Sequence, residues 1–268
     1  MTTTAELEAL AKQYRRGLFE KFLAVRQGHP GSTFSMIEIV VALYHGGFVR
    51  FDPGQKKFRD RVLISKGHAT VALYPILARF GVLPQSEWDA WGKSPSALRV
   101  FGNKSIPGID VTSGSLGHGI GVGAGMAMAY KRSGSDKRVF VVISEGELYE
   151  GSTWEALLFA AHYALSNLTV VIDVNSLIIL GRTEDCLSLN PIPDKIAGLG
   201  LEIRQCDGHD FASLLSAFPS QTGGTRPLIV LANTVKGKGC SIMEHKANWH
   251  YWNPMTAEQI EQCRRELA

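Results

Sequence analysis

Residues 139–151 read VFVVISEGELYEG, and this stretch decides the fold class. An apolar run leads directly into three glutamates, Glu145, Glu147 and Glu150, and an amphipathic run begins near Trp154. The pattern predicts a buried strand with acidic side chains at its carboxyl end, followed by a helix.

The same alternation of strand and helix patterns continues along the chain. Further strands are predicted in RVLIS (61–65), LTVVIDVN (168–175), GLEIRQCDGHD (200–210) and RPLIVLANTVKG (226–237). Helical patterns begin near Thr4 and cover about 35–48, 114–132, 153–164 and 211–218, with a break at GHPGS (28–32) and a loop-rich segment at 84–113. Continuous apolar strands that alternate with helices predict an α/β fold, a parallel sheet with helices on both faces. Because no repeat or linker interrupts the pattern, residues 1–268 are predicted to form a single domain.

Composition excludes several classes of function. The 268 residues are 45% hydrophobic and carry a net charge of only +3, without basic runs, so no nucleic-acid partner is expected. Four scattered cysteines without a Cys-x-x-Cys pair predict reduced thiols instead of disulfides or a zinc site. No signal peptide and no apolar run of about 18 residues occurs, which favours a cytoplasmic protein without a membrane span.

Two polar residues follow directly after predicted strands. In open parallel sheets, ligands bind beyond the carboxyl ends of the strands. If the strands before Glu145 and Asn175 are neighbours, a carboxylate, an amide oxygen and a backbone carbonyl meet there, and such an oxygen set suits Mg²⁺. The alternative for Glu145 is a carboxylate favoured by a helix N-terminus. Asp173 is expected to shape the turn, and Glu147 to lie at the helix N-terminus.

Several motifs in order carry a family resemblance. SGSLGHGIGVGAGMAMA, SEGELYEGSTWEA and VIDVN resemble the thiamine diphosphate motif of transketolases, and GHPGS, RVLISKGHA, IPGIDVTSGSLG, CDGHD and TVKGKG are also similar. The resemblance extends over about residues 10–265, but it covers only the N-terminal part of a transketolase. It implies the thiamine diphosphate-binding fold, in its diphosphate-binding (PP-type) form, and the N-terminal subunit of a split, two-subunit transketolase.

The resemblance also implies site residues. Metal ligands would be Glu145, Asn175 and the Leu177 carbonyl, holding Mg²⁺ beside thiamine diphosphate. The implied catalytic set is His29, His68, His250 and Glu150, the last at the interface between paired active sites. The implied cofactor-binding set is His68, Gly114, Ser115, Leu116, Ser144, Gly146, Asn175 and His250. The alternatives are an ordinary helix-start acid for Glu150, structural histidines, core packing for Leu116 and close helix packing for the later glycines of the 114–125 run.

The family reaction moves a two-carbon ketol unit from a ketose to an aldose, with the cofactor supplying the chemistry. The glutamate that activates the aminopyrimidine belongs to the part this chain does not resemble. The chain is therefore expected to be inactive alone and to need a C-terminal transketolase subunit with a pyrimidine-binding domain. An α2β2 heterotetramer acting on small-molecule sugars is expected.

Three departures from the family pattern leave the substrate open. Glu145 replaces an aspartate, and one more methylene moves its oxygens by about 1.5 Å. Mg²⁺ demands near-ideal octahedral geometry, so Ca²⁺ or Mn²⁺ is an alternative. SALRVFGNKS (96–105) lacks the family's histidine, for which Asn103 is a candidate substitute, and LIILGRTED (177–185) replaces a more polar turn. The competing functions are a thiamine-dependent acyloin-forming ligase with an α-keto acid donor, and a non-catalytic regulatory pseudo-subunit.

Overall fold

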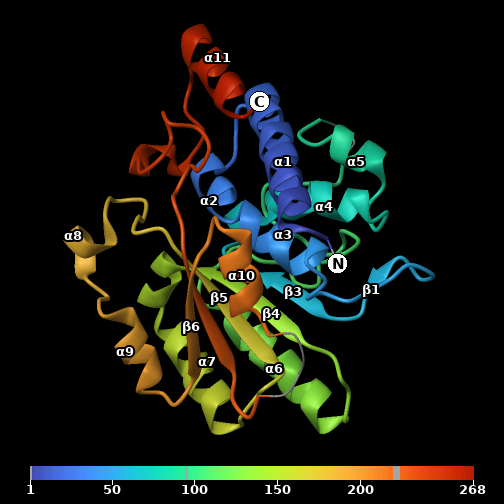
Figure 1. The fold of residues 1–268 in the computed structure, drawn as a ribbon, viewed down its shortest axis with the longest axis vertical. Coiled ribbons are helices and arrows are strands. Elements are labelled where there is room, and N and C mark those ends of the chain that lie inside the picture. The colour runs from blue at the N-terminus through green and yellow to red at the C-terminus, as the bar shows by residue number, and fades with distance from the viewer. Residues whose placement is uncertain (1, 94–95, 220–223) are drawn as a thin grey trace.

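The computed structural model describes residues 2–93, 96–219 and 224–268. Its centre is a five-stranded sheet in which every neighbouring pair is parallel, in the order β3-β4-β5-β7-β6 (Figure 1). The strands are β3 (Arg61–Ile64), β4 (Val139–Ser144), β5 (Leu168–Val174), β6 (Glu202–Asp207) and β7 (Leu228–Asn233). The predicted parallel α/β fold is confirmed, and β4 and β5 are neighbours, with Ser144 paired to Asp173.

Side chains alternate between the two faces of the sheet, as they must in a strand. Phe140 and Val142 of β4 join one hydrophobic cluster, whereas Val139 and Val141 join the other. The first face is covered by α1 (Thr4–Val25), α2 (Pro30–Ser35), α3 (Ile37–His45), η1 (Gly67–Leu73), α4 (Tyr74–Arg79) and α10 (Phe211–Ala217). The second is covered by α6 (Gly119–Arg132), α7 (Gly151–His162) and α9 (Ile192–Ala197). Figure 1 shows α1 to α4 in its upper part and α6, α7 and α9 in its lower part.

The main difference from the predicted elements lies at residues 26–36. The helix expected at 35–48 forms as α3, but a further short helix, α2, occupies much of the expected break at 28–32. Arg26 ends α1 in the left-handed conformation, and Pro30 starts α2 at its first turn. Proline is suited to that position because its φ is already helical and no amide hydrogen is needed there. Four residues, 26–29, therefore separate α1 from α2.

Several short elements fall outside the expected pattern. They are β1 (Phe51–Asp52), β2 (Lys57–Phe58), α5 (Gln85–Asp89), η2 (Glu145–Tyr149), α8 (Thr183–Leu187), η3 (Ala247–His250) and α11 (Ala257–Glu266). Helix α11 lies beside α1, where Arg264 forms a two-point ion pair with Glu20 at 2.8 and 2.9 Å (Figure 1). The C-terminal helix is thus fixed to the carboxyl-terminal half of α1.

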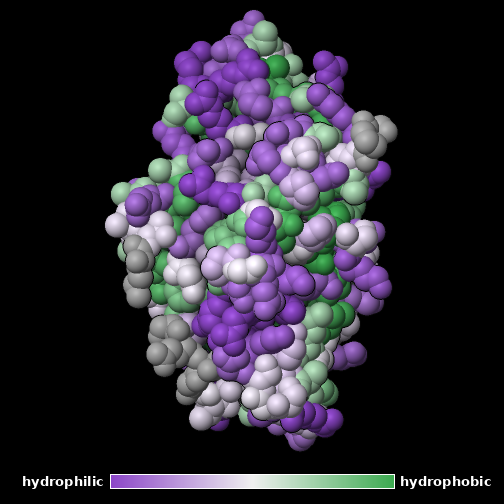
Figure 2. Space-filling view, turned by 90° about the vertical axis from the view of Figure 1, so that its right-hand side faces the viewer, coloured by the Kyte–Doolittle hydropathy of each residue, from purple (hydrophilic) through white to green (hydrophobic). Residues whose placement is uncertain are grey.

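The surface on the right-hand side of Figure 1 is mostly hydrophilic, with small apolar patches between polar side chains (Figure 2). No helix among the described residues combines the length and the apolar character that a membrane crossing requires.

Candidate active site

Three histidines from distant segments form one cluster near the carboxyl end of the sheet. The ring centroids of His29, His68 and His250 lie 4.9, 5.3 and 5.2 Å apart in the three pairs. His29 precedes α2, His68 lies in η1, and His250 ends η3. The structure therefore brings the three predicted histidines together.

Backbone contacts explain how these segments meet. Gly237 donates its backbone hydrogen to Gly31 at 3.0 Å, and Trp252 donates to Gly28 at 2.9 Å. A Cβ atom on Gly31 would lie 2.7 Å from the carbonyl oxygen of Trp249, so only glycine permits this approach. The GHPGS turn is thus held against η3 by its glycines.

The environment keeps the histidines uncharged near neutral pH. Burial, together with the positive charge of Lys236, lowers the pKa of His29 to about 4 and that of His250 to about 3. Burial also lowers the pKa of His68 well below its usual value. Nδ1 of His29 is buried and has no hydrogen-bond partner within the described residues. Neutral imidazoles can both donate and accept hydrogen bonds, as substrate hydroxyls require.

Lys236 is a buried cation beside this cluster, and the sequence interpretation gave it no role. Its Nζ lies 3.2 Å from Nδ1 of His250 and 3.5 Å from the carbonyl oxygen of Leu177. Only 2% of the residue is exposed, and none of the ion pairs among the described residues includes it. Burial lowers the pKa of Lys236 to about 8, against the opposing charge of Asp173. An anionic ligand would offset the cost of burying such a charge. The position of Lys236 in TVKGKG was the only sequence signal for it.

A second buried lysine is neutralised within the protein. Lys66 and Asp173 form an ion pair with no side-chain exposure, and Asp173 also accepts from the hydroxyls of Ser35, at 2.5 Å, and Thr234. Asp173 was expected to shape the turn after β5, and that expectation is wrong. The carboxylate instead links β5, its own strand, to α2, to the turn between β3 and η1, and to the residue that follows β7.

The three predicted metal ligands lie close together. The Glu145 carboxylate accepts from the backbone of Ser176 at 2.8 Å and from the hydroxyl of Thr183 at 2.6 Å. Oδ1 of Asn175 accepts from the backbone of Leu177 at 3.2 Å. Glu145 thus reaches from the end of β4 across to the turn that follows β5.

This donor set fits a hard divalent cation. It offers one carboxylate, one amide oxygen and one carbonyl oxygen, and each carboxylate oxygen keeps a lone pair beyond the hydrogen bond that it accepts. No group of three or more His, Cys, Asp or Glu residues suited to a metal occurs among the described residues. The remaining ligands of such an ion would therefore have to be phosphate oxygens and water.

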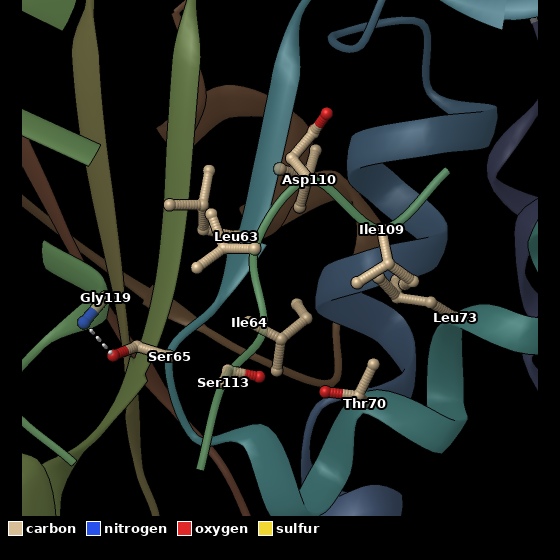
Figure 3. A pocket seen from close by; sticks show the side chains of 11 residues that line it. Leu63, Ile64, Ser65, Thr70, Leu73, Ile109, Asp110, Ser113 and Gly119 are labelled. Atoms are coloured by element: carbon tan, nitrogen blue, oxygen red, sulfur yellow. Dashed lines mark hydrogen bonds between the residues drawn. The ribbon is translucent and has the colours of Figure 1, made fainter. Parts of the chain in front are cut away.

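Glu147 takes a different position from the one expected. It accepts hydrogen bonds from the hydroxyl of Ser65 and from the backbone of Gly117 at 2.8 Å. Its carboxylate therefore connects the end of β3 to the segment before α6, and not to the start of α7, the helix that follows η2. The backbone of Gly119 donates to the same Ser65 hydroxyl at 3.1 Å (Figure 3). Burial raises the pKa of the Glu147 carboxyl.

The predicted cofactor loop packs beside His68. A Cβ atom on Gly67 would lie 2.7 Å from the backbone nitrogen of Gly114, so the loop passes directly over the start of η1. A Cβ atom on Gly146 would lie 2.9 Å from Ile178, which brings the ends of β4 and β5 close. Ser115 is exposed, and Leu116 and Ser144 are half-buried, with no contact that assigns them a role. Glu150 is exposed at the start of α7, without a side-chain cap.

Phe101, not Asn103, faces the histidines. Its ring centroid lies 5.9 Å from that of His29. Oδ1 of Asn103 instead accepts from the backbone of Ser105 at 2.9 Å and closes a local turn. The substitute role considered for Asn103 therefore receives no support from the geometry.

A small internal cavity lies behind the site, between β3 and the 109–113 segment (Figure 3). Its volume is about 10 Å³, which is close to the space that one water molecule needs. The hydroxyl of Thr70, which lines it, is buried and has no partner within the described residues. The cavity is thus a place for one water and is too small for a cofactor.

Comparison with known proteins identifies the family. Residues 9–268 match the family described as transketolase, thiamine diphosphate binding domain. One of the chains named as subunits of apulose-4-phosphate transketolase, from Phocaeicola vulgatus, is 36% identical over 98% of this chain and 94% of its own length. The 6-deoxy-6-sulfo-D-fructose transketolase subunit SqwG of a Clostridium species is 33% identical over 91% of this chain and 90% of its own length.

Among solved structures, transketolase from Pichia stipitis in complex with sedoheptulose 7-phosphate superposes with a TM-score of 0.87 at 26% identity. The match covers 97% of this chain but only 40% of that one. The chain thus spans less than half of a full-length transketolase but almost all of the relatives named as subunits. The resemblance inferred from the motifs is confirmed: the chain belongs to the transketolase family, as its N-terminal, thiamine diphosphate-binding domain.

Proposed function

We propose that this chain is the diphosphate-binding subunit of a two-chain transketolase. The enzyme would depend on thiamine diphosphate and a divalent metal, and it would transfer a two-carbon ketol unit from a ketose phosphate to an aldose. The chain would be active only together with a partner subunit that carries the pyrimidine-binding domain. The relatives that are named as single subunits of a transketolase support this arrangement.

One observation carries the proposal. Lys236, a buried cation outside every ion pair of the described residues, lies between His250 and the carbonyl of Leu177. It therefore stands where the histidine cluster meets the predicted metal ligands. A buried charge is costly unless a partner of opposite sign neutralises it. A diphosphate would supply that partner and would also supply oxygens for the metal.

Two groups of residues would then have separate roles, one in binding the metal and one in contacting the substrate. Glu145, Asn175 and the Leu177 carbonyl would hold the metal, Mg²⁺ first and Ca²⁺ or Mn²⁺ as alternatives. When bound, thiamine diphosphate supplies the carbon centre that stores the electrons of the broken carbon–carbon bond. The neutral histidines His29 and His68 would orient substrate hydroxyls and pass protons between them.

An exposed apolar patch supports association with other subunits. Four apolar side chains here are between 40% and 54% exposed: Val122 on α6, Leu158 and Phe159 on α7, and Tyr163 directly after α7. Both helices flank the second face of the sheet, and Glu150 directly precedes α7. Contiguous exposed apolar groups commonly mark protein interfaces. We therefore assign this patch to subunit contacts in an α2β2 assembly.

The relatives point to an anionic sugar substrate. Their names refer to apulose 4-phosphate and to 6-deoxy-6-sulfo-D-fructose, and each of these sugars carries an anionic group. A phosphorylated or sulfonated ketose is accordingly the proposed donor class. The second candidate is an acyloin-forming ligase with an α-keto acid donor, which the apolar ring of Phe101 beside His29 favours.

The test uses the chain purified together with the C-terminal transketolase subunit that is proposed as its partner. Thiamine diphosphate is titrated calorimetrically with Mg²⁺ and with a chelator. Turnover of xylulose 5-phosphate and of pyruvate is then compared. Metal-dependent binding with ketose turnover supports the transketolase, and turnover of pyruvate alone supports the ligase. Absence of binding with any metal contradicts both enzymes and leaves the regulatory pseudo-subunit.

A further inference from the structure

Two exposed aromatic rings flank His29 from different parts of the chain. The ring of Phe101, which is 42% exposed, lies 5.9 Å from that of His29 in an edge contact. The ring of Tyr251, which is 51% exposed, lies 4.9 Å from it in a tilted contact. We call Phe101 and Tyr251 the aromatic rim.

Other contacts place the rim over the candidate active site. A Cβ atom on Gly114 would lie 3.4 Å from Cδ1 of Phe101, so Phe101 stands between His29 and the predicted cofactor loop. Tyr251 packs against His250, with 4.8 Å between the ring centroids. Both rings therefore border the space in which the three histidines meet.

The position of Phe101 is fixed by its neighbour in the chain. A Cβ atom on Gly102 would lie 2.7 Å from Cγ2 of Thr70, so the backbone of the loop packs tightly on η1. Asn103, the nearest polar side chain along the loop, is occupied in a turn with Ser105. The loop therefore presents an apolar ring, and no side-chain hydrogen-bonding group, next to His29.

The phenyl ring of Phe101 suits carbon more than hydroxyl. Such a ring buries C–H surface favourably but offers a hydroxyl no full hydrogen bond. A pocket that hydrogen-bonds a hydroxyl rejects the analogue without it by about 10⁴–10⁵-fold, whereas an apolar pocket separates the two by only about 10²-fold. Whether the site contacts the donor's terminal carbon with an apolar ring or with a hydrogen-bonding group therefore predicts how strongly the enzyme distinguishes two donors that differ in one hydroxyl.

We propose that the aromatic rim receives the terminal carbon of the transferred two-carbon unit and admits a methyl group as well as a hydroxymethyl group. This inference rests on the proposed function, because it concerns the donor of that reaction. It extends the donor class from ketols to acyl donors on the same site. Phe101 and Tyr251 are thus specificity-determining residues.

The test compares hydroxypyruvate with pyruvate, which differ only in the terminal hydroxyl, and uses glycolaldehyde as acceptor. In each donor the bond between the carboxylate and the keto carbon breaks and CO₂ leaves. The electron pair stays on the two-carbon unit, which forms a bond to the aldehyde carbon, and the aldehyde oxygen takes a proton. The two-subunit complex with thiamine diphosphate and Mg²⁺ is assayed for kcat/KM with both donors.

We expect both donors to react, with kcat/KM values that differ by less than about 10²-fold. Phe101→Ala and Tyr251→Ala should each raise KM for pyruvate about tenfold, because the loss of one such apolar contact costs roughly that factor. Tyr251→Phe should behave as the wild type, because it keeps the ring. Phe101→His, which adds a hydrogen-bonding ring, should shift the ratio towards hydroxypyruvate.

Tyr130→Ala is the matched control. Tyr130 is a half-buried aromatic residue near the end of α6, where Lys137 lies 5.3 Å above its ring. Its removal should leave both kcat/KM values unchanged.

Separate outcomes distinguish this inference from the proposed function. If the complex binds thiamine diphosphate but prefers hydroxypyruvate by more than about 10⁴-fold, a hydrogen-bonded hydroxyl is indicated and the inference is wrong. Unchanged KM in both alanine variants, or no reaction with either donor in a complex that binds the cofactor, also overturns it. If the complex does not bind the cofactor at all, the proposed function itself fails.

Discussion

Glu145 and Thr183 are joined across the candidate metal site, with 2.6 Å between the carboxylate Oε1 and the hydroxyl Oγ1. The other carboxylate oxygen accepts from the backbone of Ser176 at 2.8 Å. An aspartate would be shorter by about 1.5 Å, one carbon–carbon bond. The glutamate therefore spans a distance that an aspartate could not span in this geometry.

The first prediction concerns this span. Glu145→Asp should weaken metal-dependent binding of thiamine diphosphate, although it keeps the negative charge. Thr183→Val should weaken the binding about 10–100-fold, as loss of the group that orients a metal ligand usually does. Thr183→Ser, which keeps the hydroxyl, is the control and should bind as the wild type does. Tighter binding in Glu145→Asp would show that Glu145 does not need to reach Ser176 and Thr183 in the working enzyme.

The second prediction concerns Lys236. Lys236→Met should lower the affinity for thiamine diphosphate by at least about tenfold, because a charge-assisted hydrogen bond contributes about 1.5–3 kcal/mol. Lys238→Met, a half-buried lysine of the same loop, should leave the affinity unchanged. Calorimetry on the two-subunit complex measures both affinities. Equal affinities for the two variants would remove the observation on which the proposed function depends.

A third prediction concerns the buried ion pair of Lys66 and Asp173. Asp173→Asn leaves the Lys66 charge buried without a partner, so the free energy of unfolding should fall by about 3–5 kcal/mol. The double variant Lys66→Met/Asp173→Leu removes both charges and should be less destabilised than Asp173→Asn. Urea unfolding measures both values. If the double variant is less stable than Asp173→Asn, an unpaired buried charge does not explain the loss of stability.

The fourth prediction concerns pH. The pKa of His29 falls from 6.5 in the unfolded chain to about 4 in the folded protein, because of burial first and the charge of Lys236 second. Between these values the unfolded state binds the proton and the folded state does not, so acidification from pH 6.5 towards 4 should lower the stability. His29→Asn should make this decline shallower, as measured by urea midpoints at pH 7, 6 and 5. Parallel declines in both proteins would contradict the low pKa.

The sequence predicted the fold class well because its strands are read directly from apolar runs. The runs at 139–144 and 168–174 both form inner strands of the sheet. Successive side chains of these strands face opposite layers of helices. The helix boundaries near Pro30 were missed, because a proline after a GH turn was interpreted as a break and not as the first turn of a helix.

The site was predicted only where a motif carried it. His29, His68 and His250 meet as expected, but the buried partners of the lysines could not be foreseen. Whether Asp173 faces a turn or Lys66 depends on the register of strands far apart in the sequence, and no local pattern encodes that register. Phe101 was missed for a similar reason, since its contact with His29 arises from how a loop of irregular structure packs.

The central claim is that this chain binds thiamine diphosphate through a metal and through Lys236, and that it does so in company with a pyrimidine-domain partner. The most direct measurement is calorimetric titration of thiamine diphosphate into the chain and its partner together, with Mg²⁺ and with a chelator. We predict saturable binding with Mg²⁺, loss of that binding in the chelator, and at least about tenfold weaker binding in Lys236→Met. Binding of equal strength with and without metal, or no binding under any condition, would contradict the account.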